Sequence, residues 1–347
     1  KVFSGWLSDR LGDRKWLTVV GYGVSTAAKP FLYFAASWPM VLAVRFADRV
    51  GKGIRTAPRD ALLADSIDER RRGLAFGLHR AGDTAGALLG LLIALAVVYA
   101  LQGIDTTLAR PTFQTIVLLS IAPAALAVLA LAIGAHNVPI AGQRPRPRLS
   151  LAGFDRRFKR FLVVIVLFTL GNSSDAFLVL RAQTLGLSVA GVMGMLAIFN
   201  LVYALVSTPA GALSDRIGRR KVIIGGWLAY AAIYLGFGLA GAAWQIWLLF
   251  TLYGLYYGLA EGAGKALVAD IVQPAQRGAA YGLYNAAIGL AAFPASMIAG
   301  LLWQGVAGWA GLGPSAPFLF GAGMALLAVA LLLLWFPGEG RVNNAAQ

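Results

Sequence analysis

Long apolar runs alternate with short polar segments along almost the whole chain. Most runs last about twenty residues, the length at which an α-helix crosses a hydrocarbon core roughly 30 Å thick. Because backbone groups in lipid must bond within their own segment, each run is predicted to be a helix. The predicted spans are 17–37, 40–62, 74–100, 113–135, 159–180, 189–211, 222–241, 244–268, 279–303 and 315–336, and Lys1–Ser4 resembles the end of another helix.

The composition agrees with a membrane protein. Hydrophobic residues make up 59% of the chain and charged residues only 13%, whereas soluble domains carry about 25% charged residues. The predicted fold class is therefore an all-α, polytopic membrane protein. The chain has no cysteine, which excludes disulfides, thiol nucleophiles and thiolate metal sites.

Positive charge is concentrated on one side of the predicted membrane. The net charge is +15, and the positive-inside rule explains it better than nucleic-acid binding does. The linker and the C-terminus are therefore predicted to be cytoplasmic, and the location is predicted to be a prokaryotic cytoplasmic membrane. One set of loops carries Arg10, Arg14, Lys15, Arg70, Arg71, Arg72, Arg144, Arg146, Arg148, Arg156, Arg157, Lys159, Arg160, Arg216, Arg219, Arg220, Lys221, Arg277 and Arg341, and the opposite set carries Arg110 and Arg181.

The chain contains an internal repeat. The segment 5–16 returns at 211–222, with each copy forming a short charged turn between apolar runs. Because both copies lie on the same predicted side, the halves are related by an axis along the membrane normal. Two further matches extend the repeat, namely Ala61–Asp65 with Ala266–Asp270 and Arg72–Leu78 with Arg277–Leu283.

The repeat divides the chain into two predicted bundles. These are an N-terminal bundle at 1–135, a basic cytoplasmic linker at 136–160, a six-helix bundle at 161–337 and a cytoplasmic tail at 338–347. The first bundle holds four helices and a stub. We therefore expect about one helix and most of a second to precede Lys1 in a longer natural protein. The alternative is a complete ten-helix protein.

Each residue type in the repeated motif has a physical role to play. The first glycine lets two helices approach closely, and the second permits a tight turn. The aspartate can cap a helix N-terminus or pair with an arginine, and the basic residues can anchor the turn at lipid headgroups. The residues are Gly5, Asp9, Arg10, Gly12, Arg14 and Lys15 in the first copy, and Gly211, Asp215, Arg216, Gly218, Arg220 and Lys221 in the second.

The motif Gly-x-Leu-Ser-Asp-Arg-x-Gly-x-Arg-Lys resembles the signature of the major facilitator superfamily (MFS), and the topology agrees over the whole chain. The resemblance implies two six-helix bundles, a central substrate site and alternating access by rocking of the halves. It also implies that the two motif copies form a cytoplasmic latch; the alternative is a charged turn that only fixes topology. Asp13 stands where the second copy has Arg219, so the first latch is expected to hold less tightly.

The predicted helix 40–62 carries an unusual stripe of charge. A cation at the centre of a bilayer costs ~2.5–3.5 kcal/mol, so the stripe must face a watery cavity or carboxylate partners. In the family that it resembles, the fourth helix lines the cavity, and Arg45 is similar to an arginine there, although that pattern expects Gly near Arg49. The alternative is an internal Arg45–Asp48 pair, with 55–60 in the gate. The candidates for the cavity are Arg45, Asp48, Arg49, Lys52 and Arg55.

Other polar residues interrupt the apolar runs. Intramembrane carboxylates are functional candidates, because a buried carboxyl group can bind and release a proton near neutral pH. We consider Asp83, Asp175 and Glu261 for proton coupling, and Asn172 and Lys265 for the cavity; Lys265 could instead neutralise Glu261. Gly82, Gly86 and Gly90 predict close helix packing, and the tyrosines at 253, 256 and 257 carry little weight because such residues often anchor at interfaces.

The predicted function is secondary active transport of a small anionic or polar solute, coupled to protons, by a monomer in the lipid bilayer. Buried positive charge favours anions. The segment around Lys265 lacks the spacing of a phosphate-binding loop. We predict no enzyme activity, cofactor, metal site or nucleic-acid partner. The alternatives are a multidrug, toxin or metal efflux antiporter and, in another class, a receptor that transports nothing.

Overall fold

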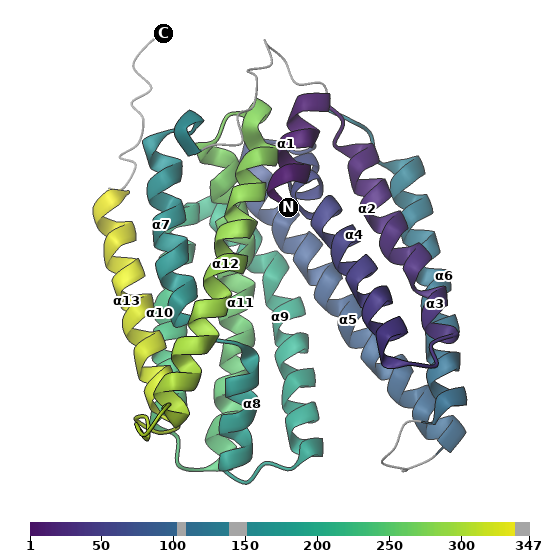
Figure 1. Cartoon of the computed structure of the whole chain (residues 1–347). Coiled ribbons are helices and arrows are strands. Elements are labelled where there is room, and N and C mark those ends of the chain that lie inside the picture. The colour runs from purple at the N-terminus through teal and green to yellow at the C-terminus, as the bar shows by residue number, and fades with distance from the viewer. Residues whose placement is uncertain (103–108, 139–150, 337–347) are drawn as a thin grey trace.

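The protein is an all-α bundle of long helices in two groups (Figure 1). The computed structural model describes residues 1–102, 109–138 and 151–336. The first group contains α1 Val2–Leu11, α2 Lys15–Ala28, α3 Pro30–Tyr33, α4 Trp38–Asp65, α5 Arg72–Gln102 and α6 Arg110–Gly134. The second contains α7 Arg156–Gly171, α8 Asp175–Thr184, α9 Val189–Ile217, α10 Arg219–Leu239, α11 Ala243–Ile271, α12 Arg277–Gln304 and α13 Ala316–Trp335.

Most predicted helices are found, with three local differences. The span 17–37 is interrupted at Lys29, because the following Pro30 has no N–H to donate. The span 159–180 is broken at 172–174, where Ser174 caps α8 by accepting from Ala176 N at 3.3 Å. The repeated motif is mostly helical, since α1 continues to Leu11 and α9 to Ile217, which leaves only a short turn after each.

The apolar surface of these helices fits a membrane. Among the described residues, seven helical spans are long and apolar enough to cross a bilayer. Leu126 and Ile133 of α6 are 65% and 76% exposed, which places large apolar side chains on the outer surface. The charged helix α4 is not among the seven. The predicted linker and tail fall partly or wholly on 139–150 and 337–347, which lie outside the described residues.

The two groups contact each other mainly through α5 with α9 and α1 with α12. In Figure 1, α5 and α9 converge toward the end that carries the α1–α2 turn and separate toward the other end. Glycines allow the approach, because a Cβ on Gly73 would meet the carbonyl of Gly211, and one on Gly5 would meet that of Gly278. We call this end the gate end.

The predicted glycine stripe on α5 has a different environment. A Cβ on Gly82, Gly86 or Gly90 would have no neighbour within 4 Å among the described residues. The prediction of close packing at this stripe was therefore wrong, because α5 has already separated from α9 there. The glycines that pack lie earlier on α5, at Gly73 and Gly77.

A substitution at the crossing of α5 and α9 provides a test. Gly73→Val should separate the two helices at the gate end, since overpacking costs about 1–3 kcal/mol and the added atoms would meet Ser214 Oγ and the backbone carbonyl of Gly211. Because the chain has no native cysteine, Ser207→Cys introduces a single buried thiol. In the Gly73→Val background this thiol should react with maleimide about tenfold faster than in Ser207→Cys alone. Gly82→Val is the matched control on the same helix. Unchanged labelling in Gly73→Val would contradict the assigned packing.

Candidate functional site

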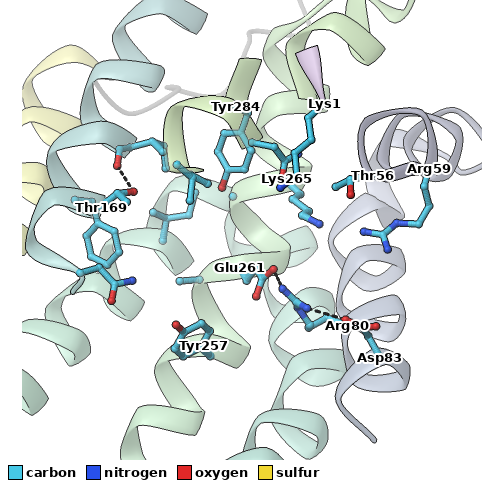
Figure 2. A pocket seen from close by; sticks show the side chains of 18 of the residues that line it. Lys1, Thr56, Arg59, Arg80, Asp83, Thr169, Tyr257, Glu261, Lys265 and Tyr284 are labelled. Atoms are coloured by element: carbon cyan, nitrogen blue, oxygen red, sulfur yellow. Dashed lines mark hydrogen bonds and ion pairs between the residues drawn. The ribbon is translucent and has the colours of Figure 1, made fainter. Parts of the chain in front are cut away.

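A cavity of about 440 Å³ lies between the two groups of helices (Figure 2). The first group contributes residues of α2, α4 and α5, and the second contributes residues of α7, α10, α11 and α12. Charged residues on its wall are Lys1, Lys52, Arg55, Arg59, Arg80, Lys265, Asp83 and Glu261, that is, six cations and two carboxylates. The volume suits a small solute.

The charged stripe on α4 reaches the cavity at one end only. Lys52, Arg55 and Arg59 line it, whereas Arg45, Asp48 and Arg49 are not among the lining residues. The position of α4 is set by its close contact with α2, because a Cβ on Gly51 would meet the backbone of Gly21 and Ser25. The stripe is therefore shared between the cavity and the outer part of α4.

Neighbouring side chains hold the two cavity arginines of α4. Arg55 donates to Ser25 Oγ at 2.6 Å and lies 4.3 Å from the centre of the Tyr22 ring. Arg59 donates to Asp60 at 2.9 Å and to the Tyr22 hydroxyl at 3.3 Å. Arg55 thus keeps its net charge, while Arg59 is compensated by the buried Asp60.

Two ion pairs connect the halves beside the cavity. Arg80 of α5 pairs with Glu261 of α11, and it also contacts Asp83 at 2.9 Å (Figure 2). Lys265 of α11 pairs with Asp60 of α4 at 3.0 Å. The alternative in which Lys265 neutralises Glu261 is wrong, because each of the two residues finds a partner on the other half. Glu261 also accepts a hydrogen bond from the Tyr203 hydroxyl.

The break between α7 and α8 separates two of the candidates. Asn172 lines the cavity, whereas Asp175 is not among the lining residues. The Tyr253 hydroxyl donates to Asp175 at 3.2 Å. Asp83 does line the cavity, but its side chain is 57% exposed.

Aromatic side chains form the wall opposite α4. The Phe168 and Trp227 rings stack at 4.5 Å with an interplanar angle of 10°, and Tyr256 and Tyr257 lie beside them on the wall. From the sequence alone, these tyrosines carried little weight as cavity residues. Tyr253 is buried behind the wall, 1% exposed. The sequence did contain a sign of this wall, namely three tyrosines close together on one helix. Helical spacing alone did not show that this helix faces the cavity.

The first motif copy forms an ion cluster at the gate end. Asp9 accepts from the backbone N–H groups of Gly278 at 3.0 Å and Ala279 at 2.7 Å, which are unpaired donors at the start of α12. Arg14 pairs with Asp9 at 3.1 Å. The first cluster is completed by Asp65, which pairs with both Arg14 and Arg277.

The second motif copy repeats this arrangement on the other half. Asp215 accepts from Gly73 N at 2.9 Å and Leu74 N at 2.7 Å, at the start of α5. Arg219 pairs with Asp215 and, at 3.1 Å, with Asp270. Arg72 completes the second cluster by pairing with Asp270 at 2.8 Å. Each cluster therefore joins one half to a helix start of the other.

The register of the motif needed a correction. Arg14 and Arg219 occupy equivalent places in the two clusters, although the alignment pairs Arg14 with Arg220. The turn after α1 is longer than the turn after α9, which moves the buried arginine by one position. The first cluster thus keeps its arginine, and the half-buried Asp13 does not replace it. Arg220 instead donates to Leu333 O at 3.1 Å.

The remaining motif residues lie at the surface of the gate end. Gly12 ends α1 in the left-handed region at φ 67°, and Gly218 has φ 98°. Arg10 lies over the Trp6 ring at 5.2 Å, and Lys15 lies over the Trp16 ring at 5.3 Å. Arg216 and Lys221 are exposed. The residues of the two clusters that were not selected from the sequence are Asp65, Arg72, Arg219, Asp270 and Arg277, although the second part of the repeat contained four of them.

Comparison with known proteins identifies the family. The Major Facilitator Superfamily profile matches residues 1–192 and 160–346. An uncharacterized MFS-type transporter of Methanocaldococcus jannaschii is 34% identical over 338 residues, covering 96% of this chain and 81% of the archaeal protein. An uncharacterized protein of Mycobacterium tuberculosis is 24% identical over 316 residues, covering 88% of this chain and 74% of that protein. The chain belongs to the major facilitator superfamily.

Solved structures show the same fold. The human organic anion transporter MFSD10 aligns with a TM-score of 0.75 at 17% identity, covering 95% of this chain and 79% of its own. The fucose:proton symporter FucP of E. coli aligns with a TM-score of 0.76 at 12% identity, covering 96% and 86%. The chain is thus an integral multi-pass membrane protein and a secondary transporter, a class that binds small solutes in the membrane, and not an enzyme.

Proposed function

We propose that this transporter moves a small anionic solute in a proton-coupled cycle of alternating access. The excess of cations over carboxylates on the cavity wall carries the proposal. Positive charge in a cavity with low-dielectric walls attracts anions and raises their local concentration. Among the three carboxylates considered for coupling, Glu261 is the best placed, because it lines the cavity and pairs with Arg80 across the halves.

The two ion clusters are proposed to be the cytoplasmic gate, closed in this structure. Both join the halves at the gate end, where the positive-inside pattern places the cytoplasm. The cavity then opens toward the opposite side of a prokaryotic cytoplasmic membrane. Helices preceding Lys1, and the division into bundles and linker, stay predictions.

Flux in proteoliposomes tests the proposal. Benzoate, lactate and butyrate are compared with their uncharged amides under an imposed pH gradient, and protein-free liposomes give the passive permeation of each acid. We expect protein-dependent uptake of at least one anion, increased by the gradient, and none of its amide. Uptake of the amides alone would contradict an anionic substrate. Absence of any uptake would favour a receptor.

Neutralising the free cations of α4 should weaken transport without preventing insertion. A hydrogen bond to a charged group contributes about 1.5–3 kcal/mol, so Lys52→Gln or Arg55→Gln should lower anion uptake about tenfold or more. The yield of membrane-inserted protein should equal that of wild type. Arg70→Gln, an exposed arginine outside the cavity, is the control. Normal uptake by both cavity variants would remove the argument from charge.

Drug or toxin export is the second candidate. The stacked Phe168 and Trp227 favour it, because aromatic walls accept apolar compounds of many shapes. The class B tetracycline resistance protein of E. coli is 28% identical over 142 residues, which are 41% of this chain and 33% of that protein. Uptake of a neutral or cationic aromatic compound in the same assay would favour export.

A further inference from the structure

The two walls of the cavity differ in chemistry. Arg59 and Arg80 belong to α4 and α5, while Tyr257 and Tyr284 belong to α11 and α12 on the other side (Figure 2). The wall of the first half is cationic, and the wall of the second half is largely aromatic and aliphatic. A solute between them would meet charge on one side and apolar surface on the other.

Three of the six wall cations, Lys1, Lys52 and Arg55, form no salt bridge within the described residues, and two of them lie together on α4. Arg59, Arg80 and Lys265 already pair with carboxylates. By contrast, Lys52 and Arg55 form no salt bridge with a carboxylate of the described chain, and they share a face of α4 because they are three residues apart. An acidic group of a solute would therefore bind here without displacing a carboxylate.

On the opposite wall, Phe168, Trp227 and neighbouring isoleucines form an apolar part beside the polar Asn172 and the tyrosine hydroxyls. Trp227 is 3% exposed and Phe168 is 6% exposed, so these stacked rings each present only a small part of their surface to the cavity. The Thr169 hydroxyl donates to Ile165 O at 2.7 Å, and Asn285 donates to Tyr281 O at 2.8 Å. Hydroxyl groups of a solute that lie against this apolar part would be left unpaired, at a cost of about 1–3 kcal/mol each. A flat apolar body would not incur this cost.

We propose that the cavity binds an amphipathic organic anion, with its acidic group at Lys52 and Arg55 and its planar apolar body against Phe168, Trp227 and Tyr257. The inference rests on the proposed anionic substrate and adds the apolar body. A volume of about 440 Å³ accommodates one or two fused rings with an acid group. Simple inorganic anions and sugars would use only one of the two walls.

Ligand binding to the purified full chain in detergent tests the proposal without flux. The probe with both features is 2-naphthoate; propionate keeps only the negative charge, and 2-naphthalenemethanol keeps only the rings. Binding is measured as the concentration dependence of thermal stabilisation. We expect 2-naphthoate to bind at least tenfold more tightly than either of the others. Equal binding of propionate would overturn the apolar body and leave the anionic function standing. If 2-naphthalenemethanol binds as tightly as 2-naphthoate, both the apolar body and the anionic function are overturned. The same holds if none of the three probes binds.

Two variants assign the walls. Arg55→Gln should weaken 2-naphthoate about tenfold and leave any binding of 2-naphthalenemethanol unchanged. Tyr257→Leu should reduce the ratio of the affinity for 2-naphthoate to that for propionate. If Tyr257→Leu does not fold, Trp227→Phe is used in its place. Arg70→Gln and Tyr99→Leu are controls on exposed residues. Wild-type selectivity in both wall variants would overturn the proposed orientation.

Discussion

Replacing Asp65 by asparagine is expected to open the gate end. The Asp65 side chain is 5% exposed and pairs with Arg14 and Arg277, each of which is 4% exposed. The substitution keeps the shape and leaves two buried guanidinium groups with less negative charge. Removing one partner of a buried ion pair costs about 3–5 kcal/mol. Because Arg277 and Asp65 belong to different halves, this cost falls on the state in which the halves touch.

The opening can be measured at a neighbouring position. Ser8 is fully buried against α12, and Ser8→Cys introduces a single thiol into a chain with no native cysteine. At about 1.4 kcal/mol per tenfold, a cost of ~3 kcal/mol predicts about 100-fold faster labelling by a maleimide in Asp65→Asn.

A neighbouring carboxylate gives the matched control. Glu69→Gln makes the same chemical change, but that side chain is 77% exposed in its pair with Arg72. Exposed pairs contribute about 0–1 kcal/mol, so labelling should stay close to the wild-type rate. If Asp65→Asn labels no faster than Glu69→Gln, the first cluster does not hold the halves together.

Glu261→Gln is expected to abolish proton-driven accumulation while leaving exchange of solute intact. In the proposed cycle, protonation of Glu261 releases Arg80 and so loosens the contact between α5 and α11. A glutamine cannot take up the proton, so the pH gradient no longer drives the solute. One pH unit corresponds to 1.36 kcal/mol. A one-to-one coupled protein should therefore accumulate solute about tenfold per pH unit, and the variant should reach no accumulation.

Asp83 provides the comparison for this prediction. Its side chain also contacts Arg80, but it is more exposed than Glu261, at 57% against 24%. Asp83→Asn should keep gradient-driven accumulation, measured in the same proteoliposomes with the same labelled anion. Loss of accumulation in Asp83→Asn, together with normal accumulation in Glu261→Gln, would show that Asp83 and not Glu261 carries the coupling. Loss of exchange in Glu261→Gln would instead indicate a structural role.

The two ion clusters show how an internal repeat gives a symmetric pair of contacts between the halves. Asp9 and Asp215 each bind two backbone N–H groups at a helix start of the opposite half. These donors have no partner within their own helix, and the positive end of the helix dipole favours a carboxylate. These hydrogen bonds require that the two halves touch. Asp9 and Asp215 therefore keep their backbone partners only while the halves are in contact at the gate end.

Prediction of the cavity from sequence was incomplete for a physical reason. The three-residue spacing of Lys52 and Arg55 fixes a shared helix face, and the expense of cations in lipid shows that this face needs water or partners. Neither argument gives the depth of a residue along the cavity. Arg45 has the same charge and helix face, yet it is not among the lining residues, because the position of α4 relative to α11 decides where the cavity ends.

The sequence by itself determined the helices, the membrane class, the duplication and the motif at each α1–α2 and α9–α10 turn. These follow from local rules, namely the length of apolar runs, the need of backbone groups for partners in lipid, and the spacing of residues along one chain. Only the tertiary structure decided that Glu261 pairs with Arg80, Lys265 with Asp60 and Arg14 with Asp65. Those pairs join residues far apart in sequence, and helical periodicity carries no information about which other helix lies opposite a given side chain.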